Sequence, residues 1–142
     1  MKPFAKIPTQ IPRSGIREIM DLAWSVEKTG PVIHLEVGQP DFSTPKHIVE
    51  ATCRYARDGH TKYVPNAGVD ELRAAAANYF QRRSGVATDP NQIAVTPGAV
   101  MSIATAFLSI LEPDDEVLLP DPGWPNYHMA ASLVHSKPVF YD

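Results

Sequence analysis

Apolar side chains recur at helical spacing in the first part of the chain. Residues 14–28 place them three or four positions apart, which predicts a helix. Residues 32–37 form a short apolar run, which predicts a strand. Thr44 is a suitable N-cap and Pro45 a suitable first residue of another helix, and Gly59 stands where a helix-terminating glycine belongs.

The clearest helical pattern covers residues 69–83, with Gly85 directly after it. Two acidic residues occupy its first turn and two arginines its last, as the helix dipole prefers. Residues 61–68, which precede this helix, have the composition of a loop. Residues 1–12 hold three prolines and show no period, and we predict an extended arm there.

From residue 92 onward the pattern changes to alternating short strands and helices. Residues 92–96, 116–119 and 137–141 are predicted strands, and 125–134 a short helix. The helix predicted over 99–111 is apolar almost all round, so we expect it to be buried on most sides. This order is typical of parallel βαβ units, and it predicts an incomplete α/β domain with an N-terminal attachment.

Composition narrows the class of protein. Hydrophobic residues make up 44% and charged residues 20% of the 142, which is typical of a folded protein. With a net charge of -3, the sequence does not show the basic character that nucleic-acid binding requires. No apolar run approaches the roughly 20 residues of a membrane span, and no secretory signal is recognisable, so we expect a cytoplasmic protein. Cys53, the only cysteine, is predicted to be a buried thiol, and the histidines lack zinc-binding spacing.

Three segments could bind a ligand. Gly98 and Ala99 follow a predicted strand and begin a helix, where backbone N–H groups can hold a phosphate; an ordinary strand-to-helix turn is the alternative. Trp124 follows the next strand, so its indole could stack on a flat ring at the same sheet edge, or it could pack into the core. Tyr63, on a Pro/Gly loop, could offer its hydroxyl to an anion or lie half-packed on the surface.

Taken together, five motifs in order resemble the first third of class I/II aminotransferases, which are fold-type I pyridoxal-phosphate enzymes. The resemblance runs from about residue 14 to the end of the chain. It implies the three-layer αβα large domain of that fold, here incomplete. The motifs are Gly38-Gln39-Pro40-Asp41-Phe42, Tyr63-Val64-Pro65-Asn66-Ala67-Gly68, Leu72-Arg73, Thr96-Pro97-Gly98-Ala99 and Asp121-Pro122-Gly123-Trp124-Pro125-Asn126-Tyr127.

The resemblance implies a role in cofactor binding for five residues. Gly98, Ala99 and Val100 match the turn whose backbone N–H groups bind the phosphate of pyridoxal 5'-phosphate. Trp124 matches the aromatic residue that stacks on the pyridine ring. Tyr63 matches a tyrosine that reaches across a homodimer to the cofactor phosphate of the other subunit. Some members carry Ser, Thr or Lys side chains in the phosphate turn, whereas this chain offers only backbone donors there.

The same resemblance implies substrates and a division of the chain. Gly38 matches the glycine that helps hold the α-carboxylate of the substrate, and Ile16 is expected to line its side-chain pocket. The substrates would be an amino acid and a 2-oxo acid. Residues 1–30 would form an arm and first helix of the small-domain or dimer segment. Residues 31–142 would form the first part of the cofactor-binding domain.

The resemblance also implies that this chain lacks the catalytic residues. The Schiff-base lysine of relatives lies beyond residue 142, and Lys62 and Lys137 stand in the wrong motifs to replace it. We therefore expect the N-terminal portion of an aminotransferase, inactive by itself. A carbon–sulfur lyase of the same fold and a short non-catalytic phosphate-binding or dimerisation module are the alternatives. Because the strand 92–96 would lack its partner, we expect the isolated chain to be poorly soluble or partly molten.

Overall fold

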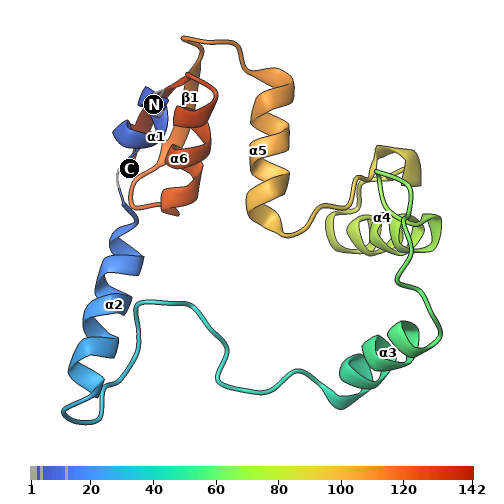
Figure 1. The fold of residues 1–142 in the computed structure, drawn as a ribbon. Coiled ribbons are helices and arrows are strands. Elements are labelled where there is room, and N and C mark those ends of the chain that lie inside the picture. Colours follow the sequence, from blue (N-terminus) through green and yellow to red (C-terminus); the bar gives the residue numbers. More distant parts are fainter. Residues whose placement is uncertain (1–2, 4, 12) are drawn as a thin grey trace. The chain divides into compact units, whose positions relative to one another are not determined.

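The computed structural model describes residues 3, 5–11 and 13–142 and divides into two compact units (Figure 1). The first unit comprises Met1–Gln39 and Gly98–Asp142, and the second comprises Pro40–Pro97. The first unit holds the sheet and the helices that cover it, whereas the described elements of the second unit are all helical.

Two parallel strands form the centre of the first unit. Strand β1 (Glu116–Pro120) pairs with β2 (Lys137–Tyr141), with Glu116 opposite Lys137, and helix α6 (Pro125–Leu133) connects them. The predicted parallel βαβ unit is therefore confirmed. Its small core consists of residues that α6, the end of β1 and the link to β2 bury together, namely Leu119, Ala130, Ala131, Val134 and Ser136. The Ser136 hydroxyl donates to the carbonyl of Ala131 at 3.0 Å, so this core contains no unsatisfied polar side chain.

Helix α5 (Ala99–Ile110) lies beside α6, and its bounds agree with the sequence prediction. Its predicted burial is wrong: none of its residues is buried, and Leu108 and Ile110 are 72% and 74% exposed. Among the described elements, α6 is the one with which α5 makes its main contact, so one side of α5 is packed. A helix that is apolar all round needs neighbours on several sides before it is buried.

Two predicted strands do not form. Residues 92–96 contain the end of a 3-10 helix, η1 (Pro90–Gln92), followed by extended chain, and residues 32–37 are also irregular. A strand exists only through hydrogen bonds to a neighbouring strand, and no described segment pairs with either run as a strand. The extended arm is likewise wrong in part, since Lys6–Gln10 forms the short helix α1, which contacts α6. Residues 1, 2, 4 and 12 of that arm lie outside the described residues.

The remaining helices form where the sequence predicts them. These are α2 (Gly15–Glu27), α3 (Lys46–Arg57) and α4 (Asp70–Ser84). Gly59 and Gly85 follow α3 and α4 with φ of 84° and 75°, a left-handed conformation that glycine adopts without steric cost. The residue before α3 is Pro45 rather than the predicted cap Thr44, and it makes no side-chain cap.

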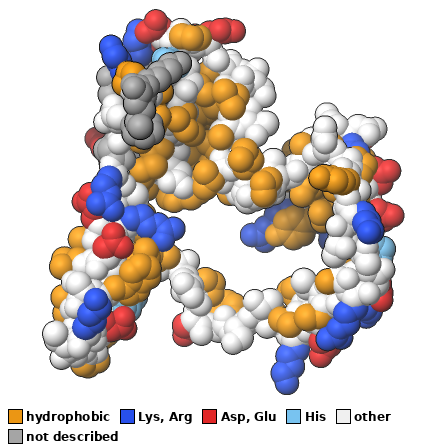
Figure 2. Space-filling model, viewed as in Figure 1, with side chains coloured by type: hydrophobic (Ala, Val, Ile, Leu, Met, Phe, Trp, Pro, Cys, Tyr) orange, Lys and Arg blue, Asp and Glu red, His pale blue; other side chains and the backbone are white. Residues whose placement is uncertain are grey.

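Apolar side chains reach the surface throughout the described residues, as the orange patches of Figure 2 show. Among these residues only Ala77, Leu119, Ala130, Ala131 and Val134 are buried apolar side chains. The apolar face of α3 is exposed, and Cys53 on this helix is exposed too, contrary to the prediction of a buried thiol. The physical reason is again the lack of a neighbouring element to cover the helix.

This exposure leads us to predict that the isolated 142-residue chain binds 8-anilinonaphthalene-1-sulfonate and unfolds without a cooperative transition. A small core with fluctuating packing produces both properties. Dye fluorescence and differential scanning calorimetry measure them. The control is the product of the complete reading frame that encodes this chain, which we call the full-frame product. A single sharp calorimetric peak from the isolated chain would contradict the prediction.

His34 links the end of α2 to the extended segment that follows. Its Nδ1 lies 2.7 Å from Oε1 of Glu36, and its Nε2 lies 3.4 Å from Oε1 of Glu27, the last residue of α2. The hydrogen bond to Glu36 is the main reason that the pKa of His34 lies above its ordinary 6.5. The same bond lowers the pKa of Glu36 below its ordinary 4.5.

We predict that this link is strongest between pH 4.5 and 6.5, where both ordinary values favour the charged pair. It weakens as pH rises through the raised pKa of His34, and as pH falls through the lowered pKa of Glu36. An NMR titration of the full-frame product should place the His34 midpoint above 6.5. Glu36→Gln should lower that midpoint, whereas Glu50→Gln on α3 should leave it unchanged; an unaltered midpoint in the Glu36 variant would reject the link.

Candidate functional site

The turn before α5 has a backbone that requires glycine. Gly98 is the N-cap of α5 with φ 93° and ψ 162°, a conformation found essentially only at glycine. No heavy atom lies within 4 Å of the position that a Cβ on Gly98 would occupy, so the conformation and not crowding demands glycine. The turn therefore presents an open, side-chain-free approach to the start of the helix.

The start of α5 is suited to an anion. Ala99 and Val100 belong to its first turn, where N–H groups have no acceptor within the helix and carry partial positive charge. The first turn contains no acidic residue that would repel an anion. Both residues are exposed. Like other helix starts it offers backbone donors, and its first turn has no acidic side chain.

Trp124 occupies the corresponding position at the start of α6. It is the residue before Pro125, and its indole meets the Tyr127 ring edge-on, with centroids 5.6 Å apart and planes at 88°. Trp124 remains 38% exposed. The tyrosine fixes one side of the indole and leaves another side open to solvent.

A tight turn holds Trp124 at the end of β1. Residues 121–123 connect β1 to α6 and include the cis peptide bond Asp121-Pro122. The Asp121 amide donates to the carbonyl of Tyr141 at 2.8 Å, which extends the pairing of β1 with β2 by one bond. A Cβ on Gly123 would collide with the carbonyl oxygen of Pro120, so only glycine permits this close return of the chain.

The Gly98 turn and Trp124 lie at the same end of the first unit. Helix α5 leads by a short turn into β1, and α6 follows β1 by another short turn, so both helices run opposite to the strands. The two helices lie side by side and begin at the carboxyl end of the sheet (Figure 1). This is the edge at which parallel sheets of α/β proteins bind their ligands.

The other predicted site residues lie elsewhere. Tyr63 is fully exposed on the loop of the second unit. Gly38 is exposed in the irregular segment after α2, and Ile16 is half-buried in the first turn of α2. The structure places Gly98, Ala99 and Val100 at the start of α5 and Trp124 at the start of α6, and these two helices contact each other.

Neither lysine singled out by the sequence has the surroundings of a nucleophile. The Lys137 ammonium pairs with the Asp114 carboxylate at 2.9 Å, and this contact raises the pKa of Lys137. A raised pKa keeps the amine protonated, and a protonated amine cannot attack a carbonyl carbon. Lys62 is exposed on the Tyr63 loop. Within the described part of the chain, no group of three or more potential metal ligands converges.

Arg73 connects α4 to residues 90–93, a contact that the sequence analysis did not identify. We call this cluster of hydrogen bonds the Arg73 joint. From α4, its Nε donates to the carbonyls of Pro90 and Ile93, both at 3.1 Å. One terminal nitrogen donates to Oδ1 of Asn91 at 3.0 Å, and the other pairs with Asp70 at 3.2 Å. The side chain is only 13% exposed. The motif Leu72-Arg73 marked this position, but its partners lie 17 to 20 residues further along the chain, beyond the reach of a periodicity argument.

Gly68 strengthens the same joint. Its φ is 99°, and a Cβ on it would lie 2.7 Å from Cγ2 of Val95. The Val95 amide donates to the carbonyl of Ala67 at 2.9 Å. The loop that carries Tyr63 is thus attached directly to the segment that leads into Gly98.

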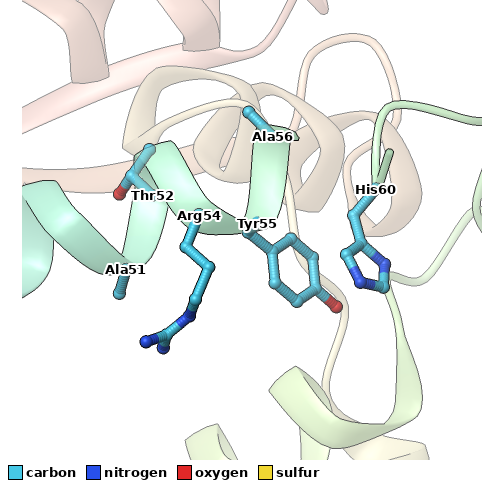
Figure 3. A pocket seen from close by; sticks show the side chains of 6 residues that line it. All are labelled: Ala51, Thr52, Arg54, Tyr55, Ala56 and His60. Atoms are coloured by element: carbon cyan, nitrogen blue, oxygen red, sulfur yellow. The ribbon is translucent and has the colours of Figure 1, made fainter. Parts of the chain in front are cut away.

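Two further pockets are shallow and open. One lies on α3, where the rings of Tyr55 and His60 stack with centroids 3.8 Å apart beside Arg54 (Figure 3). The other lies between α2 and the segment that contains Ile33 and Leu35. Neither contains any of the site residues that the sequence predicts.

The fold and this end of the sheet define a class of protein, and comparisons identify the family. The sequence profile of "Aminotransferase class I and II" matches residues 30–142. The chain belongs to this aminotransferase family. An aspartate aminotransferase from Pyrococcus horikoshii is 42% identical over 129 residues, which cover 91% of this chain and 32% of that protein. A bifunctional aspartate and glutamate/aspartate-prephenate aminotransferase from Petunia hybrida is 45% identical over 85% of this chain and 26% of its own length.

Solved structures agree with this assignment. An alanine aminotransferase from Pyrococcus furiosus superposes with a TM-score of 0.90 at 33% identity, over 98% of this chain and 36% of that one. The aspartate aminotransferase of Rhizobium meliloti gives 0.88 at 34% identity, over 99% and 35%. The fold-type I assignment and the resemblance stated above are confirmed. The chain spans about a quarter to a third of the length of the curated relatives it matches. Across the described residues, no helix is both long enough and apolar enough to cross a bilayer.

We predict that Gly98→Ala destabilises the full-frame product by about 1–3 kcal/mol, because alanine must adopt a conformation reserved for glycine. Gly15→Ala is the matched control. Both positions have open space around a new Cβ, but Gly15 begins α2 without a positive φ, so alanine there should be neutral or stabilising by about 0.4–1 kcal/mol. Urea unfolding measures both free energies; equal effects would show that the φ of Gly98 is not the constraint.

Proposed function

We propose that the protein containing this chain is a pyridoxal-phosphate-dependent aminotransferase, and that this chain supplies the part of its site that holds the cofactor phosphate and ring. The observation that carries the proposal is the pairing of α5 with α6, two neighbouring helices of which one begins with the backbone donors after Gly98 and the other with the partly exposed indole of Trp124. Family membership supports the same chemistry.

The donor set at this end fits a phosphorylated aromatic ring. The amides of Ala99 and Val100 provide hydrogen bonds and partial positive charge for the phosphate, without a charged side chain. The indole of Trp124 provides a flat face for stacking. When bound, pyridoxal phosphate supplies the electron sink that weakens bonds at the α-carbon of an amino acid. The residues of this chain bind and orient that group, and Tyr63 would add its hydroxyl to the phosphate of a neighbouring subunit in a homodimer.

The substrates in this proposal are an amino acid and a 2-oxo acid, between which the amino group is transferred. Gly38 would present its backbone to the substrate carboxylate, and Ile16 would line the side-chain pocket. The proposal keeps the division into an arm and first helix at 1–30 and the start of the cofactor-binding domain at 31–142. Names of relatives such as the aspartate aminotransferase of Pyrococcus horikoshii support this class of substrate.

The chain by itself is proposed to be inactive. Transamination needs a lysine that holds the cofactor covalently and moves the α-proton. The Lys137 amine is held protonated by Asp114, and Lys62 stands in the Tyr63 motif, where the family has no such lysine. Mixed with pyridoxal phosphate, the isolated chain should therefore show no absorbance of a lysine-linked cofactor.

We predict that the full-frame product binds pyridoxal phosphate more tightly than pyridoxal, because the α5 start recognises the phosphate. Trp124→Ala should lower the affinity for both ligands by a similar factor of roughly 2 to 12, since an aromatic contact contributes about 0.5–1.5 kcal/mol to the free energy of binding. Trp124→Phe is the control that retains a stacking face. Absorbance titration measures both affinities.

The reaction itself is tested with an amino acid and a 2-oxo acid. The cofactor absorbance of the full-frame product should change on adding the amino acid and return on adding the oxo acid. Equal affinity for pyridoxal and pyridoxal phosphate would reject the proposed phosphate site. A product that binds the cofactor but releases sulfide or a thiol, with no amino transfer, would instead be a lyase of the same fold.

A further inference from the structure

Arg73 joins α4 to residues 90–93 of the second unit through one side chain. Its guanidinium leaves α4 and donates to two carbonyls and one amide oxygen within residues 90–93, while Asp70 on its own helix balances the charge. The segment it grips is itself ordered by a reciprocal cap. The Asn91 amide donates to Asp89 at 2.7 Å, and the Asp89 amide donates to the Gln92 side chain at 3.0 Å. Arg73 thus attaches a preformed turn to α4.

This joint borders both segments proposed to reach a cofactor phosphate. Ala67, whose carbonyl accepts from Val95, stands four residues after Tyr63, and Val95 stands three residues before Gly98. The contact of Gly68 with Val95 has no space for a side chain, so the two segments move together. Ile93, whose carbonyl Arg73 holds, is two residues before Val95. Displacing the Arg73 partners therefore displaces the segment around Val95 and, with it, the base of the Tyr63 loop.

We propose that Arg73 is a positioning residue for the cofactor phosphate, which acts through the Gly68–Val95 contact on the Tyr63 loop. This inference rests on the proposed function. In a homodimer whose Tyr63 serves the neighbouring subunit, the joint would set the position of the tyrosine that reaches the cofactor phosphate of that subunit.

The chemistry of arginine suits this task. Its planar group has donors in fixed directions, and here Nε alone serves two carbonyls while the terminal nitrogens serve Asn91 and Asp70. Lysine carries the same charge on one flexible ammonium and cannot hold these acceptors in one plane. Charge alone therefore does not replace Arg73, and Arg73→Lys should behave like a variant without the joint.

The experiment measures the affinities of the full-frame product for pyridoxal phosphate and for pyridoxal, before any substrate is added. We expect Arg73→Gln and Arg73→Lys to lower the preference for pyridoxal phosphate over pyridoxal by about tenfold, which corresponds to about 1.4 kcal/mol of binding free energy. The affinity for pyridoxal itself should change little. Arg82→Gln is the matched control, because Arg82 is an exposed arginine in the last turn of the same helix, and it should retain the preference.

Two additional variants keep the test decisive. Asn91→Ala removes one acceptor and leaves the backbone bonds of the turn intact, so it should lower the preference by a smaller factor even if Arg73→Gln does not fold. Tyr63→Phe combined with Asn91→Ala, or with Arg73→Gln, should show less than the product of the single effects, because the joint acts partly through Tyr63.

The outcomes separate the two proposals. If the unmodified full-frame product shows no preference for pyridoxal phosphate, the proposed function fails, and the role of Arg73 fails with it. If the preference exists and the Arg73 and Asn91 variants retain it, the proposed function stands and the positioning role is overturned. If these variants lose affinity for both ligands equally, Arg73 serves stability only, and the positioning role is again overturned.

Discussion

The parallel pairing of β1 with β2 through α6 is the constraint on which the proposed site depends. Parallel strands require a crossover, and a helix that crosses back must start near the carboxyl end of the first strand. Helix α5 is joined to the start of β1 by a short turn, so α5 also begins near the carboxyl end of the strands. The starts of α5 and α6 therefore lie at the same edge of the sheet. It is this arrangement that allows Gly98 and Trp124 to be proposed as parts of one site.

Glycine contributes to the site in two physically different ways. At Gly98 the backbone conformation excludes other residues while the surrounding space is open, which is what access to backbone donors requires. At Gly68 and Gly123 the restriction also comes from close neighbours, since a Cβ would meet Val95 or the Pro120 carbonyl. The first kind leaves space beside a helix start, whereas the second kind holds loops against the elements that carry them.

The same chain exposes much of what its sequence marks as interior. Helix α5 and the apolar face of α3 have too few neighbours among the described residues, and Cys53 is exposed for the same reason. The relatives are about three to four times as long as the segment they share with this chain. In contrast, the Arg73 joint is complete within the chain, because all its donors and acceptors lie between residues 67 and 95. The hydrogen bonds of the Arg73 joint thus form within this chain, although the apolar faces of α5 and α3 are exposed.

The sequence by itself determined the features that depend on neighbouring residues. The bounds of α2, α4, α5 and α6, the parallel order of β1 and β2, the glycines after α3 and α4, and the motifs of the family were all readable from it, because capping, period and turn chemistry are local. Tertiary structure decided the rest. Residues 92–96 and 32–37 do not become strands without a partner to bond, and α5 is not buried without elements to cover it. Arg73 acquires its role only when folding brings distant carbonyls to its guanidinium, since hydrogen bonds between distant residues leave no periodic trace in a sequence.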